Sequence, residues 1–162
     1  MLNIESGKIQ SFKDLHSWQE GHKLVILIYK ETDAFPKSEL FSLTSQLRRA
    51  SVSLTSNIAE GYKRKGIGEY LNFLSIADAS AAELETQLII SKDLYPKIDF
   101  KEAEMLLEEV QKMLIVLIQK LNAKRSTLNP NQSGVAVILT VLLVGIILSI
   151  VLTLSLIFIP KI

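Results

Sequence analysis

The sequence predicts an all-α protein: an antiparallel up-down four-helix bundle followed by one C-terminal transmembrane helix. Three observations indicate this fold class. Apolar residues recur at steps of three and four in four successive segments, which is the spacing of one helix face. No segment alternates apolar and polar residues with the period of two that is typical of strands. Residues 134–160 then form a long run without a charged side chain.

Composition limits the classes of protein to consider. A length of 162 residues fits one ordinary domain with an additional segment. The chain has no cysteine, which excludes disulfide bonds and thiolate metal sites. Its formal net charge of +1 is too small to indicate nucleic-acid binding by itself.

The first helix is predicted to begin near Asp14 or Leu15 and to end before Pro36, because proline disfavours helix at the residue before it. Residues 1–10 show no periodicity and are predicted to form a flexible N-terminus. The bundle is therefore predicted over residues 11–125. The side chains expected on one side of the first helix are Trp18, His22, Val25, Ile28 and Tyr29.

The second helix is predicted from Ser38, as its N-cap, to Arg64. Its apolar stripe consists of Leu40, Leu43, Leu47, Ala50, Leu54 and Ile58. Because Arg48 and Arg49 cannot both lie on this stripe, at least one of them is expected to project outward. Gly61 lies within the helix at a cost of about 1 kcal/mol relative to alanine, which indicates close approach of a neighbouring helix. Glu60 is expected to pair with Arg64 one turn later.

The third helix is predicted over residues 69–94 and the fourth over residues 99–124, with Asp99 as the N-cap of the fourth. The apolar seam of the third helix consists of Tyr70, Leu74, Ala77, Ala81, Leu84 and Leu88. The seam of the fourth consists of Ala103, Leu106, Val110, Met113, Leu117 and Leu121. Four amphipathic helices with short links predict the up-down bundle.

The tail has a different character from the bundle. Residues 126–133 form a polar linker, and the 27 residues 134–160 are long enough for a helix that crosses a bilayer. Lys120, Lys124 and Arg125 precede this run, and Lys161 follows it. The positive-inside bias then predicts a membrane-anchored protein with its bundle in the cytoplasm.

Charge is unevenly distributed along the bundle. Residues 36–70 carry six basic and three acidic side chains, whereas residues 78–109 carry three basic and nine acidic ones. The basic side chains of the second helix that are candidates for RNA binding are Arg48, Arg49, Lys63, Arg64 and Lys65. A solvated surface or complementary packing between subunits explains the same pattern equally well.

The residues do not indicate an enzyme or a cofactor. His16 and His22 are six positions apart, which is not the spacing that places two metal ligands on one helix face. No serine or threonine of the second helix has an apparent base beside it. No catalytic residue, metal site or cofactor is therefore predicted.

Several ordered motifs resemble a known family. They are Phe12–Leu15, Trp18–Gln19, Phe35–Glu39, Gln46–Ala50, Asn57–Gly61, Phe73–Ala77 and Glu83–Leu88. Over roughly residues 11–121 the chain is similar to the four-helix-bundle proteins encoded in intervening sequences of bacterial 23S ribosomal RNA genes. The accessory RNA-binding proteins of diversity-generating retroelements are relatives of that group.

The resemblance implies a homopentamer and non-catalytic binding of structured RNA or a ribonucleoprotein through the basic second-helix face. The apolar tail departs from the family, whose members usually end near the fourth helix. The alternative function is a membrane-anchored oligomeric scaffold that binds protein and no nucleic acid. In that case Arg48 and Arg49 pair with acidic residues of the third or fourth helix of a neighbouring subunit.

Overall fold

The computed structural model describes residues 9–128 and 139–149, and these residues form helices and turns without a strand. The chain divides into two compact units, Met1–Asn122 and Ala123–Ile162. The predicted all-α class is confirmed for the described residues. The helices are η1 (Phe12–Asp14), α1 (His16–Thr32), η2 (Lys37–Glu39), α2 (Leu43–Tyr62), α3 (Ile67–Leu94) and α4 (Lys101–Leu128), where η denotes a 3-10 helix.

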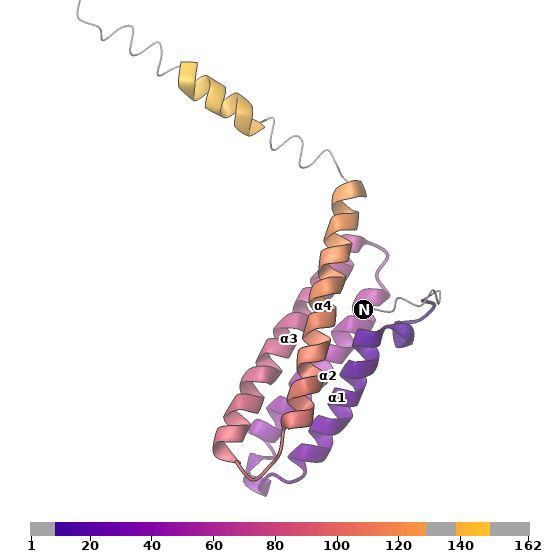
Figure 1. Ribbon diagram of the computed structural model, residues 1–162, viewed down its shortest axis with the longest axis vertical. Helices are drawn as coiled ribbons and strands as arrows, with labels where there is room; N and C mark the ends of the chain where they lie inside the picture. Colours follow the sequence, from indigo (N-terminus) through magenta and orange to yellow (C-terminus); the bar gives the residue numbers. More distant parts are fainter. Residues whose placement is uncertain (1–8, 129–138, 150–162) are drawn as a thin grey trace, which may run out of the picture. The chain divides into compact units, whose positions relative to one another are not determined.

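Within the first unit, successive long helices run in opposite directions (Figure 1). The α1–α2 and α3–α4 connections lie at one end of the bundle, where the Tyr95 hydroxyl donates to Glu39 Oε1 over 2.8 Å. The Phe35 ring also packs on Tyr95, with 4.8 Å between ring centroids. The α2–α3 turn lies at the other end. The short connections make neighbouring helices antiparallel, as the sequence predicts.

The core consists of one apolar stripe from each long helix. Leu47, Leu54 and Ile58 of α2 are fully buried, which confirms the main part of the predicted stripe. All of the predicted α3 seam is buried except Tyr70, which is half-buried. The small residues in the middle of α3 allow α2 to approach closely, and Ser53 and Ser80 are hydrogen-bonded across this contact over 2.9 Å.

The start of the second helix differs from the prediction. Residues 37–39 form the separate 3-10 helix η2, so Ser38 is not the N-cap, and α2 begins only at Leu43 with Ser42 as its N-cap. The predicted stripe fails at its first position, because Leu40 lies in the turn before α2 and remains 51% exposed. The other end of α2 lies at Tyr62, two residues earlier than predicted.

The buried faces of α1 and α4 are rotated relative to the predicted ones. In α1 the buried side chains include Leu24 and Ile28, whereas His22 and Tyr29 are exposed. In α4, Leu107 and Leu114 are buried instead of Leu106 and Met113. Both helices have apolar residues on adjacent positions, so that two overlapping stripes satisfy the same periodicity. Packing against the neighbouring helices selects one of them.

The predicted transmembrane helix over residues 134–160 is not supported. No helix in the described part of the chain combines the length and apolar character needed to cross a bilayer. Of the predicted segment, residues 139–149 are helical. Residues 134–138 and 150–160 lie outside the described residues, as do residues 1–8 of the predicted flexible N-terminus. The predicted localisation, a membrane anchor with a cytoplasmic bundle, is therefore wrong.

Candidate nucleic-acid interface

Arg48 is a structural connection between α2 and the end of α1. Its Nε donates to Thr32 Oγ1 over 2.9 Å, and its Nη2 donates to Asp33 Oδ1 over 2.7 Å. The guanidinium also lies over the Tyr29 ring, 4.7 Å from its centroid. Only 24% of the Arg48 side chain is exposed. Because Nε and Nη2 donate within the chain and the side chain is largely covered, Arg48 is less available to a phosphate than an exposed cation is.

Arg49 projects outward on the side of α2 that faces α3. Its side chain is 69% exposed, hydrogen-bonds to Gln46, and lies 3.9 Å from Glu83 Oε1. An ion pair this long between exposed groups contributes little to stability. The pair joins α2 and α3 of one chain. Arg49 therefore has an acidic partner without the neighbouring subunit that the alternative prediction invokes.

The five predicted basic residues do not form one face. Fourteen residues separate Arg49 from Lys63, which corresponds to about 21 Å along a helix. Lys63, Arg64 and Lys65 lie beyond the end of α2, in the turn before α3 begins at Ile67. The structure therefore gathers three of the five predicted residues in one place, which we call the basic corner (Lys63, Arg64 and Lys65).

Aromatic side chains support two cations of the basic corner. Lys63 Nζ lies 5.9 Å from the centroid of the Phe12 ring, and the Arg64 guanidinium lies 4.4 Å from that of Phe73. Arg64 also pairs with Glu60 Oε2 over 3.7 Å, which confirms the predicted pair. Lys65 is exposed and forms no ion pair with a described residue. The corner therefore carries three accessible cations and one paired carboxylate.

Close helix packing fixes the position of the corner. A Cβ atom added at Gly61 would lie 2.8 Å from Tyr70 Cδ2 and 3.0 Å from Phe73 Cβ, so only glycine fits without a shift. This confirms the predicted packing role of Gly61. Burial, with a smaller contribution from Tyr62, raises the pKa of Tyr70 to about 12, so its hydroxyl remains protonated. The turn that follows Gly61 is thus held against the start of α3.

The segment before α1 reaches the same corner. The Tyr62 hydroxyl donates to the Ile9 carbonyl over 3.3 Å, which supports packing rather than base stacking for this side chain. The 3-10 helix η1 begins with a capping box, in which the Ser11 side chain accepts from Lys13 N and the Asp14 side chain accepts from Ser11 N. Lys13, exposed beside Phe12, adds a cation that the sequence did not reveal, because its chain neighbour Asp14 cancels its charge locally.

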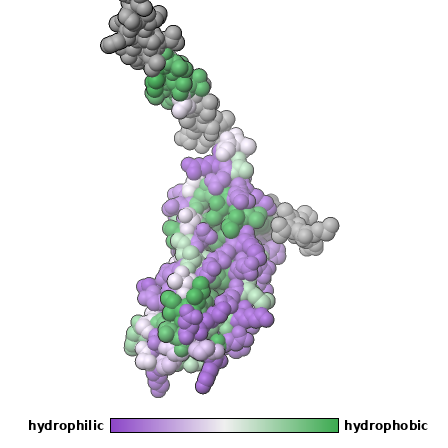
Figure 2. All heavy atoms as spheres, turned by 60° about the vertical axis from the view of Figure 1, so that its left-hand side comes forward, coloured by the Kyte–Doolittle hydropathy of each residue, from purple (hydrophilic) through white to green (hydrophobic). Residues whose placement is uncertain are grey.

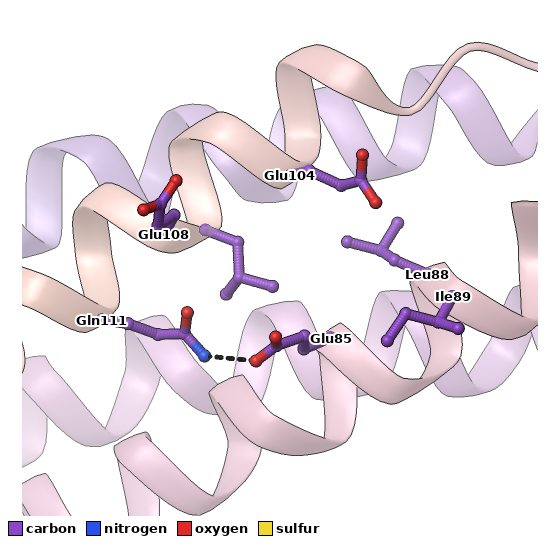
Figure 3. A pocket seen from close by; sticks show the side chains of 7 residues that line it. Glu85, Leu88, Ile89, Glu104, Glu108 and Gln111 are labelled. Atoms are coloured by element: carbon purple, nitrogen blue, oxygen red, sulfur yellow. Dashed lines mark hydrogen bonds between the residues drawn. The ribbon is translucent and has the colours of Figure 1, made fainter.

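Two grooves flank α4 within the first unit. The α3–α4 groove has a volume of about 260 Å³, an apolar floor of Leu88, Ile89 and Leu107, and carboxylates at Glu85, Glu104 and Glu108 (Figure 3). Gln111 Nε2 donates to Glu85 Oε2 across it over 2.8 Å. The second groove lies between the start of α1 and α4, where Leu15, Met113 and Leu117 are flanked by Lys112 and Lys120.

The end of the bundle away from the basic corner is acidic. Glu31 is half-buried at the end of α1, and its Oε2 is buried without a hydrogen-bond partner. Burial, and then the nearby carboxylates of Glu102 and Asp99, raise its pKa to about 7. At the same end, hydrogen bonds from Ser42 and Tyr95 lower the pKa of Glu39. Carboxylates therefore gather around Glu31 at this end of the bundle, where Lys92 is paired with Glu104.

Comparison with known proteins identifies a matching family and a solved structure with a similar fold. The sequence pattern of a family described as "23S rRNA-intervening sequence protein" matches residues 13–116. A crystal structure of a protein with unknown function from the S23 ribosomal protein family of Bacteroides thetaiotaomicron superposes with a TM-score of 0.54. At 23% identity it covers 63% of this chain and 97% of its own, so it supports the fold alone. No protein of curated function matches the chain.

Proposed function

This chain belongs to the 23S rRNA-intervening sequence protein family, and from that premise we propose that it binds structured RNA without catalysing a reaction. The binding surface is the basic corner, extended by Lys13, rather than the whole face of α2. The family name supports an RNA-related role. The observation that supports the proposal is the accessible charge of Lys63, Arg64 and Lys65, of which, among the described residues, only Arg64 forms an ion pair.

The chemistry of the corner suits phosphates better than base edges. Lysine and arginine side chains at the end of a helix contact the negatively charged backbone, and release of counterions makes such binding strongly dependent on salt. Tyr62, the aromatic nearest to these cations in sequence, is half-buried and hydrogen-bonded to Ile9. We therefore propose recognition of RNA shape rather than of sequence.

The resemblance also supports a homo-oligomer, predicted as a pentamer, and a relation to the accessory proteins of diversity-generating retroelements. Several copies would present several basic corners to one RNA, which raises the overall affinity if the RNA reaches more than one of them. A protein-binding scaffold is the second candidate function. The exposed apolar side chains near the start of α2 favour it, since such side chains are typical of protein interfaces.

The test compares two sets of neutralising substitutions in the full chain. Lys63→Gln with Arg64→Gln and Lys65→Gln removes the corner, whereas Lys92→Gln with Lys97→Gln and Lys101→Gln removes the same charge from the opposite end. Binding to a structured RNA is measured by fluorescence anisotropy from low to moderate salt. We expect the corner variant to lose affinity and to lower the salt slope by about 2–3.

The control variant should retain most of the affinity and the slope of the unaltered chain. An equal loss in both variants would show that only net charge matters. If the unaltered protein shows no salt-dependent binding to RNA, the proposed function is wrong.

A further inference from the structure

We propose that the groove between the start of α1 and α4 binds a long-chain carboxylate, with its carboxylate group at the start of α1 and its hydrocarbon chain along α4. The groove, which we call the α1–α4 groove, has a volume of about 430 Å³, within the range of about 300–1,000 Å³ that is typical of small-molecule sites. Its apolar lining consists of Leu15, Met113, Val116 and Leu117. The basic corner takes no part in this lining, so a ligand here is independent of the proposed RNA binding.

The first two N–H groups of α1 are unpaired in the described part of the chain. Leu15 occupies the N-cap position, where a serine, threonine or aspartate side chain usually accepts a hydrogen bond from the helix. The N–H groups of Trp18 and Gln19 both donate to the Leu15 carbonyl over 3.0 Å. Those of His16 and Ser17 donate to no described residue. Unpaired N–H groups and the helix dipole together favour an anion at this position.

Ser17 is an independent indication of a ligand. The residue lines the groove and is only 5% exposed, yet its hydroxyl forms no hydrogen bond with a described residue. Such a hydroxyl is unfavourable, because burial removes its hydrogen bonds to water. Other buried hydroxyls, those of Thr32 and Ser91, donate to the carbonyl four residues earlier. For Ser17 that carbonyl belongs to Lys13 and accepts from Gln19 Nε2 over 2.8 Å instead. The Ser17 hydroxyl is therefore available to a ligand in the groove.

Lys120 places a positive charge at the same end of the groove. The helices α1 and α4 run in opposite directions (Figure 1), and the end of α1 lies beside the start of α4, where the Glu102 carboxylate acts on Glu31. The start of α1 therefore lies beside a later turn of α4, and Ser17 and Lys120 line the same groove. Lys120 is exposed and forms no ion pair with a described residue. It is available to a carboxylate that accepts hydrogen bonds at the start of α1.

The other polar residues of the lining set the direction of the ligand. Lys112 is paired with Glu108, and His16 is exposed at the start of α1. Glu109 lies eleven residues before Lys120, about 16 Å away along α4, and so is distant from the start of α1. A carboxylate group therefore meets the cation and the free donors at one end of the groove. The hydrocarbon chain then extends along α4 away from that end.

The apolar side of the groove is not covered by the bundle. Met113, Val116 and Leu117 are half-buried, so each keeps surface outside the core. On the face of the molecule shown in Figure 2, hydrophobic residues likewise form separate patches among hydrophilic ones. A hydrocarbon chain would cover this side of the groove, and a methionine side chain adapts readily to such a ligand. A phosphate of RNA would satisfy the same donors but would leave the apolar surface in water, which favours the carboxylate.

Binding is tested by isothermal titration calorimetry of the full chain with octanoate, decanoate and dodecanoate, each below its micelle concentration. Each added methylene should raise the affinity by about two- to fourfold, until the hydrocarbon chain extends beyond the groove. 1-Decanol and decylamine, which lack the negative charge, should bind about tenfold more weakly than decanoate. No detectable binding of decanoate, or equal affinity for decanoate and 1-decanol, would overturn the proposed site.

Two conservative substitutions locate the site. Ser17→Ala removes the unpartnered hydroxyl and Lys120→Gln removes the cation, and each should weaken decanoate binding by about 3–10-fold with little effect on 1-decanol. Neither should unfold the bundle, since alanine favours helix and Lys120 is exposed. The matched controls Ser56→Ala and Lys101→Gln, at exposed positions of α2 and α4, should bind as the unaltered chain does. Unchanged affinity in both groove variants would place the ligand elsewhere, such as on the apolar residues 134–160, and would contradict the proposal.

RNA binding is measured in parallel to separate the two proposals. Decanoate should not change the affinity of the full chain for RNA, and the corner variant should bind decanoate as the unaltered chain does. Failure of RNA binding with intact decanoate binding would contradict the proposed function alone. If Ser17→Ala weakened RNA binding while decanoate did not bind, the start of α1 would be a phosphate contact, and the carboxylate site would be wrong.

Discussion

Glu31 is expected to destabilise the bundle at neutral and higher pH. One of its carboxylate oxygens is buried without a hydrogen-bond partner, and Asp99, Glu102 and Glu104 surround it, with Lys30 as the opposing charge. Burial first and Glu102 second raise its pKa from 4.5 to about 7. In the folded state the neutral form is therefore favoured over a pH range in which the unfolded chain is already ionised.

The sign of the effect follows from proton binding. Between pH 4.5 and about 7 the folded state binds more protons at Glu31 than the unfolded state does, so the free energy of unfolding falls as pH rises. A shift of about 2.5 pKa units corresponds to at most about 3.4 kcal/mol. Because the side chain is only half-buried, water screens part of this, and we expect about 1–2 kcal/mol.

Glu31→Gln removes the charge while retaining the shape of the side chain. At pH 8 the variant should exceed the unaltered protein in stability by about 1–2 kcal/mol, or about 4–10 °C in Tm for a domain of this size. At pH 4 the two proteins should unfold at nearly the same temperature. Thermal unfolding followed by circular dichroism over this pH range measures the Tm of both proteins. The other carboxyl groups are present in both, so the difference in Tm reports the substitution of Glu31.

Glu109→Gln is the matched control, because Glu109 is exposed on α4. Glu102→Gln should also stabilise the protein at pH 8, and its effect should largely vanish in the Glu31→Gln background, since both act on one repulsion. A stability difference for Glu31→Gln that is the same at pH 4 and pH 8 would refute this account of Glu31.

Four further substitutions test the packing that positions the basic corner and the core. Gly61→Ala should destabilise the bundle by about 1–3 kcal/mol, because the added methyl group overlaps Tyr70 and Phe73. Gly68→Ala has no atom near the added methyl group and should stabilise the bundle by up to about 1 kcal/mol. Thermal unfolding measures both effects. Arg48→Lys keeps the charge but loses the fork to Thr32 and Asp33, so we expect a loss of about 1 kcal/mol with RNA affinity unchanged. Leu54→Ala, at a fully buried position, should cost about 3 kcal/mol in denaturant unfolding, and a cost below about 1 kcal/mol would place Leu54 outside the core.

The fold was largely predictable from the sequence because helix periodicity is a local signal. Leu47, Leu54 and Ile58 recur at helical spacing on one face of α2, and the structure buries that face. Prediction failed where two registers were nearly equivalent, as in α4, where Leu106 and Leu107 both fit an apolar stripe. It also failed at Ser38, because a 3-10 turn and an α-helix start share the same residue preferences.

The candidate site was less predictable, because the role of a basic side chain depends on contacts distant in sequence. Arg48 and Lys63 both follow residues of the apolar stripe of one helix. Their neighbours in the sequence do not distinguish the roles of the two side chains. Arg48 meets Asp33 and Thr32, fifteen and sixteen residues earlier, because the α1–α2 connection returns the chain beside it. Lys63 lies past the last turn of α2 and forms no ion pair with a described residue.

The same reasoning explains why the charge of the chain separates into two ends. In an up-down bundle, residues near the α1–α2 connection share one end with those near the α3–α4 connection, while the α2–α3 turn lies at the other. Acidic side chains of α1 and α4 thus meet around Glu31, although about seventy residues separate Glu31 from Glu102 in sequence. Their mutual repulsion destabilises that end. At the basic corner Arg64 is paired with Glu60, whereas Lys63 and Lys65 form no ion pair with a described residue. The surface proposed for RNA therefore lies at the end of the bundle where accessible cations remain.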